Sequence, residues 1–156
     1  MLLRAAARLS PPGISVELYR ELGTVPLFNA DLELLDPPPV AVLRRRIIAS
    51  DAVLIASPEY AHGVSGVLKN ALDWMVGNES FVGKPVALLN ASARATIAQA
   101  ALRETLLTMS AHVVAEACVT IPVLGSGLDE DGIVMHPQMA PLLVGALKAL
   151  ERAVAS

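Results

Sequence analysis

The chain of 156 residues is poor in several residue types, and each scarcity excludes a class of protein. A single cysteine, Cys118, allows no disulfide within the chain. Aromatic residues make up only 3% of the sequence, which argues against an aromatic-rich β-sandwich. No apolar run reaches the roughly 18 residues of a membrane span, and residues 1–10 are too short and too interrupted by arginine for a signal peptide. The sequence therefore predicts a soluble cytoplasmic protein with no membrane partner.

Charged residues are also scarce, at 17% of the chain, and the two signs nearly balance. The net charge of -3 gives no electrostatic reason to expect a nucleic-acid partner. The one basic run, Arg44–Arg46, is interpreted as the solvated side of a helix. The histidines His62, His112 and His136 lack the spacing of metal ligands, so no metal site is predicted. The acidic stretch Asp129–Gly132 is predicted to be a turn, because it lacks the ligand order of a calcium loop.

The abundant residues are small and apolar. Hydrophobic residues make up 54% of the chain, with Ala, Val and Leu prominent, which argues against disorder and suits helices packed closely on a sheet. The length suits one domain, and neither a repeat nor a long linker divides it. We therefore expect a single domain over residues 1–156. Cys118 lies in an apolar stretch and is expected to be a buried core thiol.

Helical and strand patterns alternate along the chain. Apolar residues recur at spacings of three and four where helices are predicted, as in residues 64–77. Short, continuously apolar runs are typical of strands that are buried on both faces of a parallel sheet. The predicted helices cover residues 2–10, 40–49, 64–77, 96–109 and 138–154, and the predicted strands cover 14–18, 51–57, 85–90 and 112–119.

This alternation predicts an α/β fold, a three-layer α/β/α sandwich whose parallel sheet is built by right-handed crossovers. In such sheets, ligands bind beyond the carboxyl ends of the strands. We therefore expect the chemistry to lie in the loops that follow strands 51–57 and 85–90.

The loop after strand 51–57 leads directly into a predicted helix. Its position offers backbone N–H groups of the helix N-terminus to a ligand. Tyr60 adds a flat apolar face and a hydroxyl. The loop therefore suits a planar heteroaromatic ring with polar edges. Its residues are Pro58, Glu59, Tyr60, Ala61, His62 and Gly63.

The segment Ser57–Trp74 (SPEYAHGVSGVLKNALDW) resembles the flavin-side loop and following helix of the NADPH-dependent FMN reductase family. The family pattern there is S-P-E-Y-N-x-G-x-x-x-x-L-K-N-A-[IL]-D-W, and Ala61 stands where asparagine is usual. Weaker similarity extends along the chain, including Pro26–Asn29 and Gly83–Pro85. The resemblance implies a flavodoxin-like fold and hydride transfer from NAD(P)H through FMN to an acceptor such as flavin or quinone.

The resemblance also implies a cofactor site, a co-substrate and an assembly. NADPH would be the co-substrate, a small molecule the electron acceptor, and the chain a homodimer or homotetramer. No side chain is assigned a catalytic role, because the cofactor carries the chemistry. The residues expected to bind the cofactor are Pro58, Glu59, Tyr60, Ala61, His62 and Gly63, joined by Asn90, Ser92 and Arg94 from the loop after strand 85–90.

Several residues of the matching segment have a structural alternative. Glu59 either contacts the ligand or caps the local turn. His62 either takes part in proton transfer or is simply exposed. Lys69 and Asn70 are expected on a solvated or subunit-facing side of their helix. Trp74 is expected to be a packing or subunit-contact residue and not to stack on flavin.

The beginning of the chain departs from the family pattern. The family starts with a buried central strand and a loop like G-S-x-R-x-x-S-x-N, which cradles the FMN phosphate, and neither is found here. Losing about three charge-assisted hydrogen bonds of roughly 1.5–3 kcal/mol each would weaken binding about 10³-fold or more. We therefore expect FMN binding to be weak or absent. The loop at residues 90–96 also lacks glycine, which limits the approach of its backbone to a ring.

The missing central strand leaves three explanations open. The sequence is shortened relative to the functional protein, or it is a degenerate, non-catalytic flavodoxin-like homo-oligomer. In the third explanation, segment 14–18 or a second chain fills the gap. Some such contact is expected, because unpaired backbone groups beside a central gap are costly.

Overall fold

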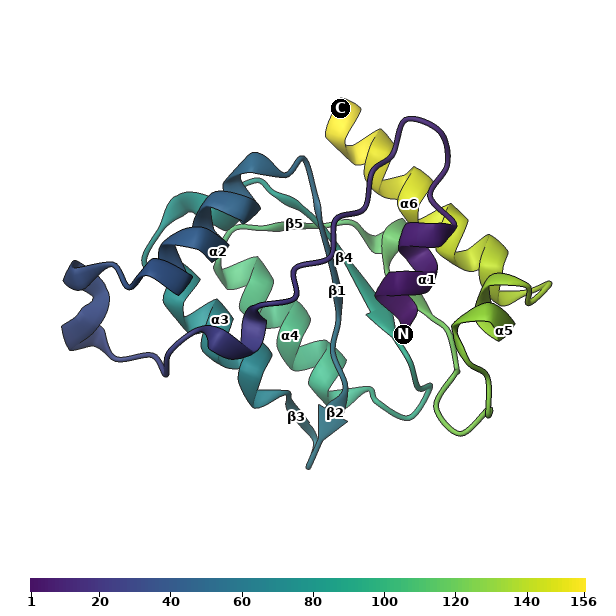
Figure 1. The fold of residues 1–156 in the computed structure, drawn as a ribbon, viewed down its shortest axis with the longest axis horizontal. Helices are drawn as coiled ribbons and strands as arrows, with labels where there is room; N and C mark the ends of the chain where they lie inside the picture. Colours follow the sequence, from purple (N-terminus) through teal and green to yellow (C-terminus); the bar gives the residue numbers. More distant parts are fainter.

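A parallel sheet lies at the centre of the computed structural model, which describes all 156 residues, and helices cover both of its faces (Figure 1). Strand β1 (Val53–Ala56) pairs along its whole length with β4 (Pro85–Asn90). On its other edge β4 pairs first with β5 (His112–Val113) and then with β6 (Val119–Thr120). No strand pairs with the outer edge of β1.

The helices form the two outer layers. On one face lie α1 (Leu2–Arg8), α5 (Glu130–Val134) and α6 (Met139–Ala155), which are grouped on the right of Figure 1. On the other face lie α2 (Pro38–Ala49), α3 (Gly66–Val76) and α4 (Ile97–Thr108). The remaining elements are the hairpin strands β2 (Glu59–Tyr60) and β3 (Gly63–Val64) and the 3-10 helices Leu22–Thr24, Ala30–Leu35, Glu79–Phe81 and Ala115–Ala117.

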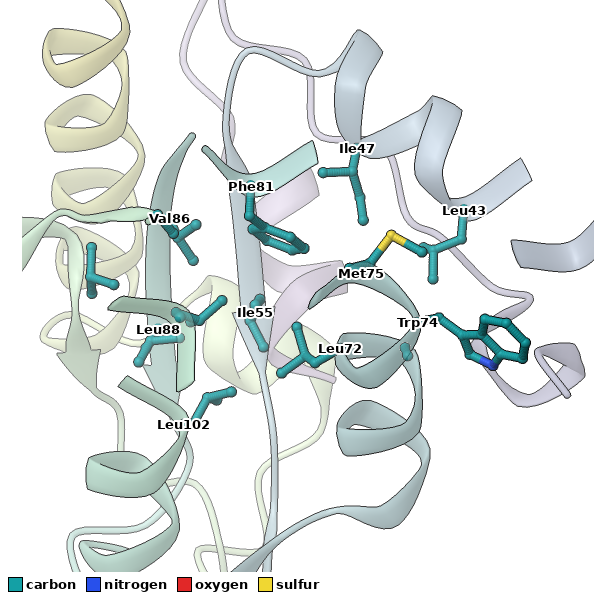
Figure 2. Packing of buried hydrophobic residues seen from close by; sticks show 14 of the residues in the cluster. Leu43, Ile47, Ile55, Leu72, Trp74, Met75, Phe81, Val86, Leu88 and Leu102 are labelled. Carbon is teal, nitrogen blue, oxygen red and sulfur yellow. The ribbon is translucent and has the colours of Figure 1, made fainter. Parts of the chain in front are cut away.

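Strand β4 connects the two halves of the core. Successive side chains of a strand point to opposite faces. Val86 and Leu88 accordingly pack with α2, α3 and α4, where Figure 2 shows them beside Phe81 and Leu102. Ala87 and Leu89 point to the opposite face, toward α1, α5 and α6. Residues 86–90 are buried on both faces, as the continuously apolar run predicts.

Trp74 closes the outer end of the core between α2 and α3 (Figure 2). Its side chain is 3% exposed, and Nε1 donates a hydrogen bond of 2.8 Å to the carbonyl oxygen of Pro26. The ring of Phe28 meets the indole edge-on, with 5.1 Å between the centroids. The packing role expected for Trp74 is therefore the one observed, and the residue ties the loop around Pro26 to α3.

Asn70 lies one turn before Trp74 and holds the same loop. Its Oδ1 accepts from the backbone N–H of Phe28 at 2.8 Å, and its Nδ2 donates to the carbonyl of Pro26 at 3.0 Å. Asn70 is thus half-buried and bound to this loop, whereas a solvated or subunit-facing position was expected. Lys69 lies on the solvated side of the helix, where it pairs with Asp73 at 2.5 Å.

Most predicted elements are confirmed to within two residues at each end. All five predicted helices form, and the strands predicted at 51–57 and 85–90 are β1 and β4. Helix α2 can begin at Pro38, because the backbone N–H that proline lacks would have no hydrogen-bond partner in the first turn of a helix. These elements establish the predicted α/β/α layering.

The strand predicted at 14–18 is wrong. Ile14, Val16 and Leu18 are half-buried while Ser15 and Glu17 are exposed, so the expected alternation is present. The segment nevertheless belongs to no sheet, and it pairs with no strand although the outer edge of β1 is free. The alternating pattern thus predicted which side chains are half-buried, but it did not predict whether the segment pairs with another strand.

The strand predicted at 112–119 is divided into β5 and β6. Between them the chain forms the 3-10 helix Ala115–Ala117, which tucks the fully buried Ala117 against Ala149 and Leu150 of α6. The turn also leaves Cys118 only partly buried, so the expectation of a buried core thiol is wrong.

The acidic stretch predicted to be a turn is the start of helix α5. The Oδ1 atom of Asp129 accepts from the backbone N–H of Gly132 at 2.8 Å, which is the bond that a helix N-cap makes. The sequence did not predict this helix, because it is only five residues long and the polar residues at its start are also typical of a loop.

The surface shows how the charged residues are used. Arg44 pairs with Asp36 at 2.7 Å and Arg46 pairs with Glu17 at 2.6 Å, while Arg45 is exposed on α2. The basic run is therefore the solvated side of a helix, as predicted. None of the helices combines the length and the apolar composition that a bilayer crossing requires.

Candidate functional site

The loop at the carboxyl end of β1 is a tight hairpin. Strand β1 ends near the buried Ser57, and Glu59–Tyr60 then pairs antiparallel with Gly63–Val64. The two turn residues, Ala61 and His62, have φ angles of 49° and 61°. Left-handed geometry at both central positions matches the right-handed twist of the flanking strands. The chain therefore projects a compact two-stranded hairpin beyond the sheet.

Ala61 adopts this geometry at a cost. A side chain in the left-handed region costs roughly 1–2 kcal/mol, and asparagine tolerates the region because its short polar side chain bonds locally. Asparagine is the residue usual at this position in the family pattern, so the pattern and the turn agree. Alanine at this position therefore takes up the left-handed turn without the local hydrogen bond that asparagine can make.

Glu59 connects the hairpin to helix α4. Its Oε2 accepts from the backbone N–H of Ala98 at 2.8 Å, in the first turn of the helix. Its Oε1 lies 3.1 Å from Nδ1 of His62. The Ala98 hydrogen bond, followed by the His62 side chain, lowers the pKa of the Glu59 carboxyl. Glu59 thus caps the start of α4, whereas the expected alternative to ligand contact was a cap of the local turn.

His62 is held from one side only. Its side chain is 75% exposed, and Glu59 is its hydrogen-bond partner. The exposed position leaves the ring accessible to a molecule placed against the hairpin.

Glu59→Gln is expected to lower the thermal unfolding midpoint by a few degrees at neutral pH. Glutamine can still accept from Ala98 N–H, so the change removes the charge and keeps the contact. Because the pKa of Glu59 is lowered on folding, its contribution is present above the unfolded-state pKa and is lost as pH falls through the folded-state pKa. The difference between the two proteins should therefore disappear in acid.

The measurement is circular dichroism melting at neutral pH and below the pKa of Glu59. Glu116→Gln, at an exposed glutamate of the 3-10 helix, serves as the matched control and should leave the midpoint unchanged at both pH values. An equal loss for Glu59→Gln at both pH values would contradict the role of the charge.

The second predicted loop follows β4. Asn90 is buried, and its Oδ1 accepts from Ser92 N–H at 3.1 Å while its Nδ2 donates to the carbonyl of Ala95 at 3.2 Å. Ser92 Oγ accepts in turn from Arg94 N–H at 3.3 Å. Asn90 therefore shapes the loop from inside, and Arg94 is exposed.

The two loops lie side by side because Glu59 reaches the start of the helix that the second loop enters. The N–H groups of Ala61 and His62 make no hydrogen bond within the chain, so two backbone donors remain available at the hairpin tip. The Tyr60 side chain is also exposed, at 67%. The arrangement offers a flat aromatic face and polar donors to a planar ligand.

A cavity of about 240 Å³ adjoins the second loop. Among the predicted site residues, only Asn90 lines this cavity. Its lining also includes Gln99 and Arg103 of α4 and the partly buried Cys118. No group of three or more His, Cys, Asp or Glu side chains gathers where it could hold a metal ion.

Sequence reasoning missed the first turn of α4 as a member of this site. Ala98 is 39 residues away from Glu59, and no local pattern links them. The sequence predicted that a ligand contacts the N-terminus of α3, the helix that follows the loop. In the structure, the hairpin packs against the N-terminus of α4.

Comparison with known proteins gives one consistent result. A profile of the NADPH-dependent FMN reductase family matches residues 1–123. An NAD(P)H-dependent FMN reductase of Pseudomonas aeruginosa is 38% identical over 155 residues, which cover 96% of this chain and 83% of the relative. An NADPH:quinone oxidoreductase of Arabidopsis thaliana is 43% identical over 95 residues, 57% of this chain and 48% of that protein.

A solved structure supports the same conclusion. FerB, a flavoenzyme NAD(P)H:(acceptor) oxidoreductase from Paracoccus denitrificans, superposes with a TM-score of 0.80 at 30% sequence identity. The match covers 99% of this chain and 87% of FerB. The predicted flavodoxin-like fold is therefore confirmed, and a non-catalytic role is not favoured, because these relatives carry the names of enzymes.

Proposed function

The chain belongs to the NADPH-dependent FMN reductase family, and on this premise we propose that it is an NAD(P)H-dependent oxidoreductase that uses FMN to reduce a small acceptor such as a flavin or a quinone. One observation carries the proposal. The start of the segment that matches the family pattern forms a hairpin at the carboxyl end of β1, where ligands of such sheets bind.

The hairpin fits the ring system of a flavin. Tyr60 offers an exposed aromatic face, and the free N–H groups of Ala61 and His62 suit the polar edge of the ring. Pro58 and Gly63 complete the hairpin, and Glu59 fixes its position against α4. The neighbouring loop adds Ser92 and Arg94 at the rim, positioned by Asn90. When bound, FMN would supply hydride acceptance from NAD(P)H and delivery to the acceptor.

The residues that would hold the FMN phosphate fit less well. The first turn of α4 is a natural anion site, but the carboxylate of Glu59 already occupies its Ala98 N–H. Arg94 is the basic side chain of the two loops, and it is exposed. We therefore propose that residues 1–156 bind FMN weakly, chiefly through its ring.

A homodimer or homotetramer is the proposed assembly. Several large apolar side chains around the loop that Trp74 anchors face solvent, and Leu27 and Leu34 are 83% and 97% exposed. Large apolar side chains that are exposed close together in the sequence are expected where subunits associate. The arrangement supports subunit contact at the end of the molecule that carries Ala30–Leu35, which projects to the left in Figure 1.

The test is NADPH oxidation by the purified chain. Consumption of NADPH with excess FMN and a quinone should run well above the rate of the same mixture without protein, and it should require the flavin. No protein-dependent consumption, with the chain shown to be folded by circular dichroism, would overturn the proposal.

A further inference from the structure

The cavity of about 240 Å³ beside the second loop lies at the carboxyl ends of two paired strands. Asn90 and Thr120 are the last residues of β4 and β6, they pair in register, and both line the cavity. Ligands of such sheets bind beyond the carboxyl ends of the strands. The cavity therefore lies at the same end of the sheet as the hairpin, but on the other side of β4 from β1.

Helix α4 forms the polar side of this cavity. Arg103 follows Ala100 by three residues and Gln99 by four, so all three share one face of the helix, and all three line the cavity. The sheet forms the apolar side, with Leu88 and Val119 in the lining. A cavity with polar groups on one side and apolar groups on the other suits a polar molecule that also carries a ring.

Arg103 is the single charged residue of the lining. It takes part in none of the salt bridges of the chain. The nearby acidic residues Glu104 and Glu116 are exposed and do not line the cavity, so no carboxylate there offsets the positive charge. Gln99 and Thr120 add an amide and a hydroxyl as further donors. These groups together suit an anion with several oxygen atoms.

Helix α4 also connects the cavity to the hairpin. Glu59 of the hairpin accepts from the backbone N–H of Ala98, and Arg103 lies five residues further along the helix, a rise of about 7.5 Å. A molecule that reacts at the hairpin must therefore extend past the start of α4 to reach Arg103. NADPH has this form, because two riboses and a pyrophosphate separate its nicotinamide from its 2′-phosphate.

We propose that the cavity binds the 2′-phosphate of NADPH, and that Arg103 is the residue by which the chain prefers NADPH to NADH. The inference rests on the proposed function, in which NAD(P)H delivers hydride to a flavin at the hairpin. NADH carries a hydroxyl where NADPH carries this phosphate, so the phosphate is the difference that the protein must detect. The planar guanidinium of arginine matches two phosphate oxygens at once, and Gln99 and Thr120 donate to the phosphate beside it.

The phosphate of FMN is the main competing occupant, because it is also a phosphate monoester. Only a short ribityl chain separates it from the flavin ring, whereas the dinucleotide is long enough to pass from the hairpin along α4. Riboflavin lacks the phosphate, so a comparison of FMN with riboflavin distinguishes the two sources.

The first experiment measures the binding of two nucleotides to the full chain by calorimetry, without flavin. The probe 2′,5′-ADP has the phosphates of the adenosine half of NADPH, and 5′-AMP has that of NADH. We expect 2′,5′-ADP to bind about tenfold more tightly, the value of one charge-assisted hydrogen bond of about 1.5 kcal/mol. Equal affinities in the folded chain would overturn the proposal.

Cys118 provides a second readout that does not depend on activity. It is the chain's single cysteine, it is partly buried, and it lines the cavity, so its alkylation by iodoacetamide reports on this site alone. Alkylation should slow as 2′,5′-ADP is added and should follow the same saturation curve as the heat of binding. Protection by FMN and not by riboflavin would assign the cavity to the flavin phosphate, against the proposal.

Three variants test the role of Arg103. Arg103→Gln should bind 2′,5′-ADP and 5′-AMP equally, and Arg103→Lys should retain part of the preference, since it keeps the charge and loses the planar fork. Arg152→Gln removes an exposed, unpaired arginine of α6 outside the cavity and should behave as the parent. Arg103 is exposed, so the variants should melt as the parent does by circular dichroism. A preference for 2′,5′-ADP that persists in Arg103→Gln would overturn the assignment.

Kinetics with excess FMN separate recognition from catalysis. Arg103→Gln should raise the KM for NADPH about tenfold, while kcat and both constants for NADH stay unchanged. An equal loss with both nucleotides would show a structural role and overturn the assignment of Arg103. A parent chain that binds 2′,5′-ADP as expected but oxidises no NADPH would overturn the proposed function and leave the phosphate site standing.

Discussion

Replacing Trp74 with alanine is expected to lower the free energy of unfolding by about 3–5 kcal/mol. The side chain is 3% exposed, so truncation leaves a cavity between α2 and α3. It also removes the donor to the Pro26 carbonyl and the edge-on contact with Phe28. Proteins are stable by only about 5–15 kcal/mol, so a loss of this size is a large fraction of the total.

Trp74→Phe is the matched control for the Trp74 prediction. Phenylalanine keeps most of the buried ring and loses the Nε1 hydrogen bond, so it should cost about 1–3 kcal/mol. Urea unfolding should be followed by circular dichroism, because Trp74 is the chain's single tryptophan and its fluorescence disappears with it. Equal unfolding midpoints for the parent and Trp74→Ala would contradict the anchoring role.

FMN and riboflavin are expected to bind the chain with affinities within about tenfold of each other. A site with three charge-assisted phosphate contacts, each worth roughly 1.5–3 kcal/mol, would prefer FMN by about 10³-fold or more. The first turn of α4 cannot provide these contacts, since Glu59 caps it and would repel a phosphate. Arg94 is exposed, and exposed ion pairs contribute little, about 0–1 kcal/mol.

The phosphate prediction is checked by fluorescence titration of both flavins at equal ionic strength. Arg94→Ala should reduce the affinity for FMN slightly and leave riboflavin unchanged. A preference for FMN near 10³-fold would show that residues 1–156 hold a phosphate site, against the proposal.

Strand β4 and the helices could be predicted from the sequence because their signals are local. A continuously apolar run bounded by Pro85 and Asn90 specifies a strand covered on both faces. Apolar spacing in Gly66–Val76 likewise specifies one buried helix face. Each of these patterns lies entirely within the residues of the helix or strand that it predicts.

Pairing and capping could not be predicted, because they depend on residues distant in the sequence. Ile14–Leu18 shows the alternation of a strand, yet the alternation alone does not decide whether the segment pairs with a strand of the sheet. Glu59 was assigned two alternative roles because the N–H that it caps belongs to Ala98, on the far side of β4 in sequence. The anchoring role of Asn70 was missed for the same reason, since its partners are Pro26 and Phe28.

The left-handed turn of the hairpin could not be predicted from its own residues. The left-handed residues are Ala61 and His62, and neither alanine nor histidine is a strong signal for such a turn. The family pattern, with asparagine at position 61, carries the information that the residues themselves lack.

The flavin affinity of Tyr60→Ala tests most directly the claim that the hairpin carries the flavin ring. Loss of an aromatic face that stacks on a heteroaromatic ring costs about 1–3 kcal/mol, so the dissociation constant should rise roughly 5- to 150-fold. Tyr60→Phe, which keeps the ring, should bind flavin nearly as well as the parent. The exposed position of Tyr60 means that both variants should fold normally. Unchanged flavin affinity in a correctly folded Tyr60→Ala protein would contradict the placement of the ring on this hairpin.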